Sequence, residues 1–410
     1  MMRLLLAIAL LCPLAALAET ALERYEAEDY KGAARLGLRE LADAPKGAKT
    51  DELRLAVANS LAWTGQYDLA IPQYKALFGT RYDTDARIGL ANVLRWNGQA
   101  DLADPYYREV LARDPNNAEA KLGRELGGRD LRPAVTVRGG HTSDNQGVSL
   151  NEFGLSYRRW TEDLKGRWEI GALTGQMDSP QGDFSPKGVQ GSLWLPQAPF
   201  APKVEAFVYD NGISGARLFG AAQVEPIRDK LRIRVARVDW GRLAFSGAAT
   251  RDGLTAGMLG IFGATSTPLG DVRARLDAYD ISDDNRVLDG EASIKPAWQP
   301  LPAQVKWITG VTGRYADRED PRYWSPHPAY GVAFLGIERG WYLDRLDLTA
   351  SARRSFTFTE TAGDGWSVGL SGKYWIARAL AIGVDAWMVN APRPTPYAMR
   401  QVGAFVQQLW

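Results

Sequence analysis

The chain has 410 residues and a formal charge of +1, from 49 Lys and Arg residues against 48 Asp and Glu residues. This balance excludes the basic excess of a nucleic-acid-binding protein, and a single cysteine excludes a disulfide framework. The length exceeds that of one ordinary core. We predict an α+β multidomain chain: a signal peptide over residues 1–18, a helical domain over 19–128 and a β-barrel over 129–410.

The first eighteen residues have the pattern of a secretory signal peptide. Arg3 supplies the positive charge, residues 4–14 form the apolar stretch, and residues 16–18 are an Ala-Leu-Ala cleavage site. A lipoprotein attached at Cys12 is the alternative, but the residue before this cysteine is bulky. We therefore expect the mature chain to begin at Glu19 without any thiol, which excludes thiolate catalysis and cysteine-based metal sites.

The next segment, from Thr20 to Gly128, has helical spacing and repeats itself. Its second copy ends at Pro115, and residues 29–34 resemble an earlier half-copy. The period resembles that of tetratricopeptide repeats and implies two and a half to three helix pairs. Small residues would let the helices approach, aromatic residues would form the core, and the domain would dock periplasmic or inner-membrane proteins. The repeated residues are Trp63, Gly65, Ala70 and Tyr74, which recur 33 positions later as Trp96, Gly98, Ala103 and Tyr107.

The pattern then changes to period two. No segment after the signal peptide reaches the roughly 18 apolar residues of a spanning helix. From Pro133 to Trp410, runs of about ten residues alternate apolar and polar side chains between turn residues, for example over 231–235, 272–279 and 346–353. Only a closed barrel satisfies every backbone group in lipid without helices. We count about sixteen runs and predict an antiparallel transmembrane barrel of about sixteen strands.

A soluble β-sandwich would also alternate, so the membrane interpretation needs further support. It comes from the signal peptide, from aromatic residues at strand ends, and from a final run over 402–410 that ends on an aromatic residue. Gln408 departs from the outer-membrane assembly signal, where an apolar residue is typical. We expect a bacterial outer-membrane location with the helical domain in the periplasm. The strand-end residues are Trp160, Trp168, Trp240, Trp341 and Trp375.

The order of these parts resembles the outer-membrane exporters of bacterial exopolysaccharides, including the cellulose-synthase outer-membrane subunit and the poly-N-acetylglucosamine export porin. The repeat array is much shorter than in the synthase-linked exporters, so the chain is most similar to YaiO-type barrels. The resemblance implies a porin-like export channel of biofilm-forming bacteria. At the level of individual residues, the resemblance is carried by an aromatic-Ser-Pro…Tyr segment, which consists of Tyr323, Trp324, Ser325, Pro326 and Tyr330.

Few residues suit catalysis. Imidazole chemistry is confined to His141 and His327. His141 precedes Thr-Ser-Asp but lies beside a turn, and His327 lies between two prolines. No phosphate loop, metal-ligand spacing or nucleophile elbow is present. The acidic stretches 283–285 and 317–320 lack the spacing of an EF-hand. We expect no enzyme, no cofactor and no metal.

The remaining candidates are side chains on the polar faces of the clear strands, which would line the lumen. Their small basic surplus favours a neutral or anionic polymer over a cationic one. Phe207, Tyr209 and Trp387 would also face inward, either stacking on sugar rings or packing within the lumen. The nine basic and six acidic candidates are Glu152, Arg158, Arg167, Glu169, Glu205, Arg232, Arg234, Arg273, Arg275, Asp277, Lys306, Asp347, Arg353, Lys373 and Asp385.

Two alternatives to an export channel stay open. One is a structural or receptor barrel with a plugged lumen, whose loops bind a phage or another cell. Phage sensitivity together with wild-type polymer secretion in a deletion strain would favour it. The other is an outer-membrane enzyme acting on lipid or glycan, which the substitution His141→Ala should inactivate.

Overall fold

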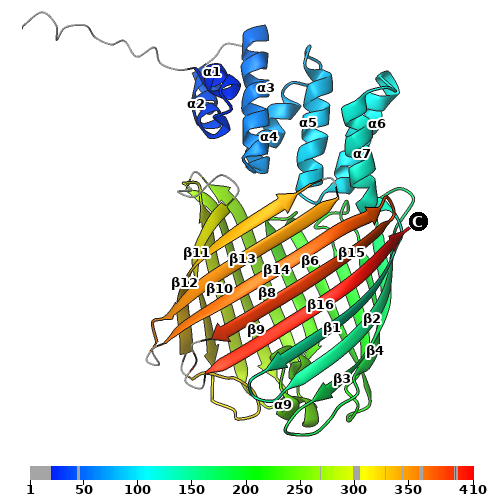
Figure 1. Cartoon of the computed structure of the whole chain (residues 1–410), viewed down its shortest axis with the longest axis vertical. Coiled ribbons are helices and arrows are strands. Elements are labelled where there is room, and N and C mark those ends of the chain that lie inside the picture. The colour runs from blue at the N-terminus through cyan, green and yellow to red at the C-terminus, as the bar shows by residue number, and fades with distance from the viewer. Residues whose placement is uncertain are drawn as a thin grey trace, which may run out of the picture. The chain divides into compact units, whose positions relative to one another are not determined.

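The computed structural model describes residues 20–43, 47–267, 269–298, 305–327, 329–343, 345–359, 363–391, 393 and 396–410. The predicted signal peptide lies outside these residues. The chain divides into two compact units, one ending at Asp130 and one beginning at Leu131 (Figure 1). None of the described helices combines the length and the apolar character needed to cross a membrane.

The helical unit has the predicted arrangement of consecutive helix pairs. A turn with one glycine joins the helices of the second pair and of the third pair. Gly65 and Gly98 occupy these turns with φ of 79° and 75°, a conformation that glycine adopts without strain. We predicted that small residues at these positions let two helices approach closely. The two glycines instead recur because the turn requires a positive φ. The helices are α1 (Ala21–Glu26), α2 (Tyr30–Asp43), α3 (Ala48–Trp63), α4 (Tyr67–Lys75), α5 (Asp83–Trp96), α6 (Ala100–Arg113) and α7 (Ala118–Leu131).

The core of the repeats contains two equivalent tyrosines. Tyr74 is buried and its hydroxyl donates to Asn59 Oδ1 at 2.7 Å. A Cβ at Gly89, on the following helix, would overlap the Tyr74 ring. Tyr107 repeats this arrangement, with its hydroxyl 2.7 Å from Asn92 Oδ1 and its ring against a glycine at position 123. Ala70 and Ala103 are fully buried, while Pro115 lies in the turn before α7.

The two repeated tryptophans are not core residues, contrary to the prediction. Trp63 is 50% exposed and Trp96 is 42% exposed. Each is the last residue of its helix, where one ring face covers an aromatic residue of an earlier helix and the other meets solvent. Trp63 stacks on Tyr25 with ring centroids 5.8 Å apart and meets Tyr30 edge-on at 4.7 Å. Trp96 lies 6.4 Å from Tyr67.

The second unit is a closed antiparallel barrel of sixteen strands, as predicted. Each strand pairs with its neighbours in sequence, and β1 pairs with β16 from Ala134 opposite Leu409 to Asp144 opposite Met399. We call the end where β1 begins and β16 ends the terminal end, and the opposite end the distal end. The strands are β1 (Ala134–Asp144), β2 (Ser149–Trp160), β3 (Arg167–Asp178), β4 (Lys187–Trp194), β5 (Lys203–Asp210), β6 (Ala216–Ile227), β7 (Leu231–Asp239), β8 (Thr255–Thr267), β9 (Gly270–Ile281), β10 (Arg286–Pro296), β11 (Val305–Ala316), β12 (Ala329–Tyr342), β13 (Leu346–Thr357), β14 (Asp364–Ala377), β15 (Leu380–Ala391) and β16 (Tyr397–Leu409).

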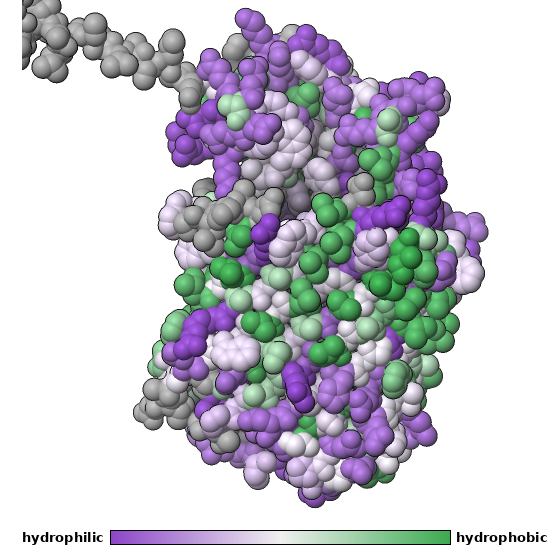
Figure 2. Space-filling model, in the orientation of Figure 1, coloured by the Kyte–Doolittle hydropathy of each residue, from purple (hydrophilic) through white to green (hydrophobic). Residues whose placement is uncertain are grey.

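The outer face of the barrel is apolar. Figure 2 shows hydrophobic side chains gathered over the barrel wall on the face in view. Outward-facing aromatic residues lie towards both ends of the strands, as in the aromatic girdles of outer-membrane barrels. Those towards the terminal end are Tyr157, Trp168, Trp307, Trp341 and Tyr374, and those towards the distal end are Tyr315, Phe356 and Trp366.

Three of the five tryptophans predicted for these girdles lie elsewhere. Trp160 and Trp375 are buried and belong to the inner face of their strands, because a strand end alone does not fix which face a side chain takes. Trp240 is 1% exposed and begins a short helix instead of ending a strand. Trp168 and Trp341 point outward, as predicted.

Candidate functional site in the barrel lumen

The alternation of the strands places all fifteen predicted charges on the inner face of the barrel. On β5, for example, Val204 and Val208 are exposed on the outside, while Glu205 and Tyr209 point inward. Asp347 and Arg353 share the inner face of β13, and Arg273, Arg275 and Asp277 share that of β9. Their role in solute passage remains a prediction.

Inside the lumen several of these charges form ion pairs. Arg234 on β7 reaches Glu205 on β5 at 2.7 Å, and Arg275 lies 3.4 Å from Asp277. Arg232 pairs with Glu225 at 3.2 Å, and Arg353 pairs with Glu291 at 3.5 Å. Glu225 and Glu291 also face inward but were absent from the predicted set. Two of the nine basic candidates, Arg232 and Arg353, are therefore paired with acidic residues that lie outside the predicted set.

A short helical wedge enters the lumen at the distal end. It consists of α8 (Trp240–Ala244) and α9 (Gly247–Arg251), which connect β7 to β8. Asp239 and Ser246 cap these helices by accepting from the backbone N–H groups of Arg242 at 2.8 Å and Ala249 at 3.2 Å. The Trp240 ring packs on two tyrosines, Tyr279 at 5.1 Å and Tyr323 at 5.5 Å. This buried cluster anchors the wedge to the inner face of β8–β11.

The wedge also reaches the opposite wall. The Arg242 guanidinium donates to Glu152 of β2 at 3.0 Å and lies 5.1 Å above the Tyr209 ring and 5.9 Å from the Phe207 ring. Phe245 packs against a cluster that includes Val148. Tyr209 is 5% exposed beneath these contacts. Phe207 and Tyr209 therefore pack against the wedge, which is one of the two arrangements that the sequence allowed.

A second inward segment, the inward loop (residues 317–327), lies beside the wedge. Arg322 joins three acidic side chains: Asp320 at 2.7 Å, Asp283 at 2.6 Å and Asp252 at 3.5 Å. Hydrogen bonds from this guanidinium hold the pKa of Asp320 below its usual range. The Ser246 hydroxyl donates to the Arg322 carbonyl and so ties the wedge to the loop.

The aromatic-Ser-Pro segment forms the rest of the inward loop. The Tyr323 hydroxyl accepts from Asn285 Nδ2 at 3.0 Å, and the Ser325 hydroxyl accepts from the Asp320 N–H at 2.6 Å. The Pro326 carbonyl accepts from the N–H of residue 316 at 3.0 Å. Trp324 takes no part in these hydrogen bonds and meets Tyr330 edge-on, with ring centroids 5.0 Å apart. The segment therefore holds the loop in place and presents one aromatic ring to open space.

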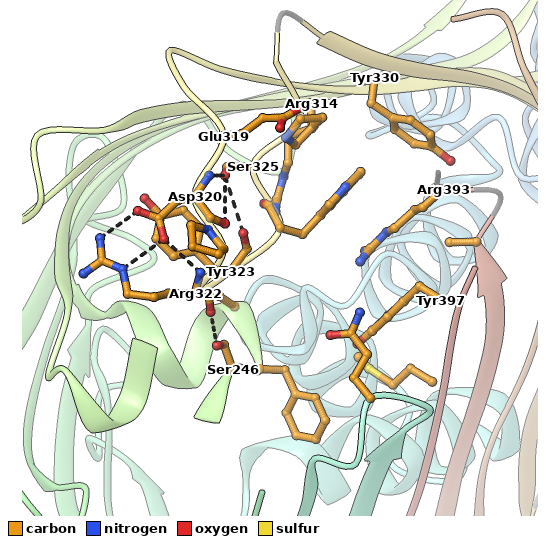
Figure 3. Close-up of a pocket in the computed structure, with 18 of the residues that line it drawn as sticks. Ser246, Arg314, Glu319, Asp320, Arg322, Tyr323, Ser325, Tyr330, Arg393 and Tyr397 are labelled. Atoms are coloured by element: carbon orange, nitrogen blue, oxygen red, sulfur yellow. Dashed lines mark hydrogen bonds and ion pairs between the residues drawn. The ribbon is translucent and has the colours of Figure 1, made fainter. Parts of the chain in front are cut away.

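That open space is a cavity of about 1150 Å³ between the wedge, the inward loop and a wall that includes β12, β15 and β16. Figure 3 shows Tyr330, Arg393 and Tyr397 across the cavity from Ser246 and Arg322. A second cavity of about 270 Å³ follows on the inner faces of β13–β16, and Trp387 lines both. The second cavity is otherwise lined mainly by small or polar side chains, including Thr349, Ser351, Ser371, Asp385 and Gln401.

The two histidines occupy separate places. His141 belongs to the outer face of β1, where its Nδ1 lies 2.9 Å from Asn151 Oδ1, while Asp144 of the same strand faces inward. The neighbouring Ser143 accepts from Arg400 Nε at 2.9 Å. His327 Nδ1 donates to the carbonyl of residue 316 at 2.9 Å, within the inward loop.

A closed barrel of sixteen antiparallel strands with aromatic girdles and a polar lumen has the architecture of outer-membrane channels, and this barrel fits that class. The fold supports an outer-membrane location. Neither a protein-family model nor a curated protein sequence matches the chain.

Solved structures share the fold. A bacterial polysaccharide outer membrane secretin matches with a TM-score of 0.55 and 10% identity, over 68% of this chain and 98% of that chain. OpdK of Pseudomonas aeruginosa, solved with vanillate, matches with a TM-score of 0.35 and 7% identity over the same shares. YrrB, a TPR protein with an unusual peptide-binding site, matches with a TM-score of 0.24 and 22% identity over 26% of this chain and 54% of that chain. At such identities the first likeness concerns the fold alone, and the other two are too distant to support an argument.

Sequence reasoning missed the wedge and two arginines, Arg242 and Arg393. Only the residue types of Asp239 and Ser246 indicated these helices in the sequence, because Asp and Ser often cap helix N-termini. Each accepts from the backbone N–H three residues later. Helices of five residues have no apolar periodicity that would strengthen this signal.

Proposed function

We propose that this protein is an outer-membrane channel that exports an exopolysaccharide, with its helical unit in the periplasm docking secretion proteins. The observation that carries the proposal is the open cavity beside the wedge, together with the second cavity along β13–β16, which shares Trp387 with it. The two cavities would give the polymer a route lined by aromatic and polar side chains. This route lies beside the part of the distal end that the wedge and the inward loop fill.

The lining suits a sugar polymer. The apolar faces of sugar rings stack on aromatic side chains, and sugar hydroxyls exchange hydrogen bonds with small polar groups. Trp324, Tyr330 and Trp387 supply rings along the route, and Ser351 and Gln401 supply polar groups. The fold shared with a polysaccharide secretin agrees with this substrate class. The channel performs no chemistry on its cargo, so we propose that it is not an enzyme.

The helical unit suits docking to a protein. Stacked helix pairs of this type provide extended surfaces for protein segments. Here the half-exposed rings of Trp63 and Trp96 repeat along the stack and offer apolar contact area in addition to their packing. Periplasmic or inner-membrane secretion proteins are the proposed partners.

A deletion strain tests the export function. We expect loss of surface polysaccharide and accumulation of polymer in the periplasm, both reversed by the full-length gene. A variant with His141→Ala should restore export fully, because this side chain lies outside the route. Normal polymer secretion without the protein would contradict the proposal.

The filled side of the distal end favours one second candidate, a receptor barrel whose loops bind a phage or another cell. The wedge and the inward loop occupy part of the lumen there. Altered phage sensitivity with wild-type polymer secretion in the deletion strain would support this candidate over export.

A further inference from the structure

We propose that Arg393, held between Trp324 and Tyr397, is a binding subsite for carboxylate groups of the exported polymer, which would then contain acidic sugars. The inference rests on the proposed export function and adds the substrate class.

The first observation is the position of the Arg393 side chain. Its guanidinium carbon lies 3.7 Å from the centroid of the Trp324 ring and 4.0 Å from that of the Tyr397 ring. The guanidinium thus lies over two aromatic rings, which hold it by cation–π contact. All three residues line the large cavity, and Figure 3 shows Arg393 and Tyr397 directed into it.

The second observation is that Arg393 lacks a counter-ion. Within the described part of the chain no carboxylate forms an ion pair with it, and its buried Nε has no hydrogen-bond partner. The charge of Asp144 favours the cationic form of Arg393, but the two side chains form no ion pair. Burial lowers the pKa of Arg393 to about 10, so the side chain still carries its charge at neutral pH.

The other arginines around the cavity behave differently. Arg314 contacts both carboxylate oxygens of Asp289, and Arg322 contacts three carboxylates. Leaving a buried charge unpaired is costly, so a fold that needed Arg393 only for packing would gain by pairing or replacing it. An unpaired cation in a cavity is instead suited to an anion that arrives from outside.

The geometry favours a carboxylate on a sugar. A guanidinium binds a carboxylate through two parallel N–H···O bonds, and contact with two aromatic rings limits the movement of this side chain before binding. Trp387 and Tyr330 line the same cavity and provide ring faces for the sugar that carries the group. A neutral polymer would accept only ordinary hydrogen bonds from the guanidinium, and a cationic polymer would be repelled by its charge.

The test is block of ion current through the purified full-length protein in planar bilayers. The added compounds are trigalacturonate and the uncharged maltotriose, which have the same number of sugar units. We expect trigalacturonate to block at a lower concentration than maltotriose. Arg393→Gln should raise its half-blocking concentration about tenfold and leave the weak maltotriose block unchanged, as expected for loss of one charge-assisted pair.

A matched control and a second variant complete the design. Arg354→Gln removes an arginine from the outer face of β13, where it pairs with Asp364 at 2.6 Å, and should not change the block. Arg393→Lys keeps the positive charge but lacks the paired N–H donors of the guanidinium, so it should give an intermediate half-blocking concentration. This variant also tests the subsite if the Gln variant fails to fold.

The outcomes separate the two proposals. Equal block by both trisaccharides, or an unchanged trigalacturonate block in the Arg393 variants, overturns the acidic-sugar subsite and leaves a conducting channel in place. A folded wild-type protein that conducts no current overturns the channel itself.

Discussion

At the distal end of the barrel, two sides of one lumen are built in different ways. The side from β2 to β11 is filled by the wedge and the inward loop, and their arginines form ion pairs, as in the contact between Arg242 and Glu152. The side from β12 to β16 is left open and is lined by aromatic rings, small polar side chains and the unpaired Arg393. Under the proposed function, the paired charges fasten the constriction and the open side is the one that would contact the solute.

Removal of the wedge should have the largest effect on the difference between the two sides. Replacement of residues 240–252 by a two-glycine link should raise the ion conductance severalfold, because the filled side of the lumen becomes open. The barrel should still fold, since β1 and β16 close it independently of the wedge. Conductance is measured in planar bilayers, and retained heat-modifiable migration in gels is the control. An unchanged conductance would mean that the wedge is not the constriction.

Acidification should release the fastening of the inward loop. The lowered pKa of Asp320 means that its contact with Arg322 stabilises the loop at neutral pH and is lost as the pH falls through this depressed value, below the ordinary 3.8. We expect current steps to larger conductance to become frequent only below about pH 4. Asp320→Asn should show such steps already at pH 7. Steps that begin near pH 6 would point to another group.

Much of this architecture was predictable from sequence because it is periodic. The 33-residue offset predicted the helix pairs, and the period-two runs predicted sixteen strands. The constriction was not predictable, because Arg242 and Glu152 are 90 positions apart and meet only when the barrel closes. Likewise, the repeat pattern identified Gly65 and Gly98 as packing residues. The glycine that contacts the Tyr74 ring is instead Gly89 on the following helix, which the pattern did not identify.

On the open side, Trp387→Ala should weaken block by oligosaccharides severalfold with little change in ion conductance. Its ring lines both cavities, so its loss removes one stacking surface without widening the constriction. Phe207→Ala is the matched control, because that ring lies under Arg242 on the filled side and should not contact the sugar. Equal effects of both substitutions would remove the distinction between the two sides.

A substitution in the helical unit should leave both sides of the lumen intact. Tyr74→Phe removes the hydrogen bond to Asn59, which costs about 1 kcal/mol of stability, and Tyr107→Phe should cost a similar amount through Asn92. Thermal melting of the full chain, followed by helical circular dichroism, measures the loss. Conductance should be unchanged, and a changed conductance would show that the repeats control the pore.

If the barrel is open along β12–β16 while its other side is filled, ions should pass through it. Single-channel recording of the purified full-length protein measures this passage. We expect a steady conductance at neutral pH without any stimulus. A protein that is folded and heat-modifiable yet electrically silent would contradict it and favour the plugged receptor barrel.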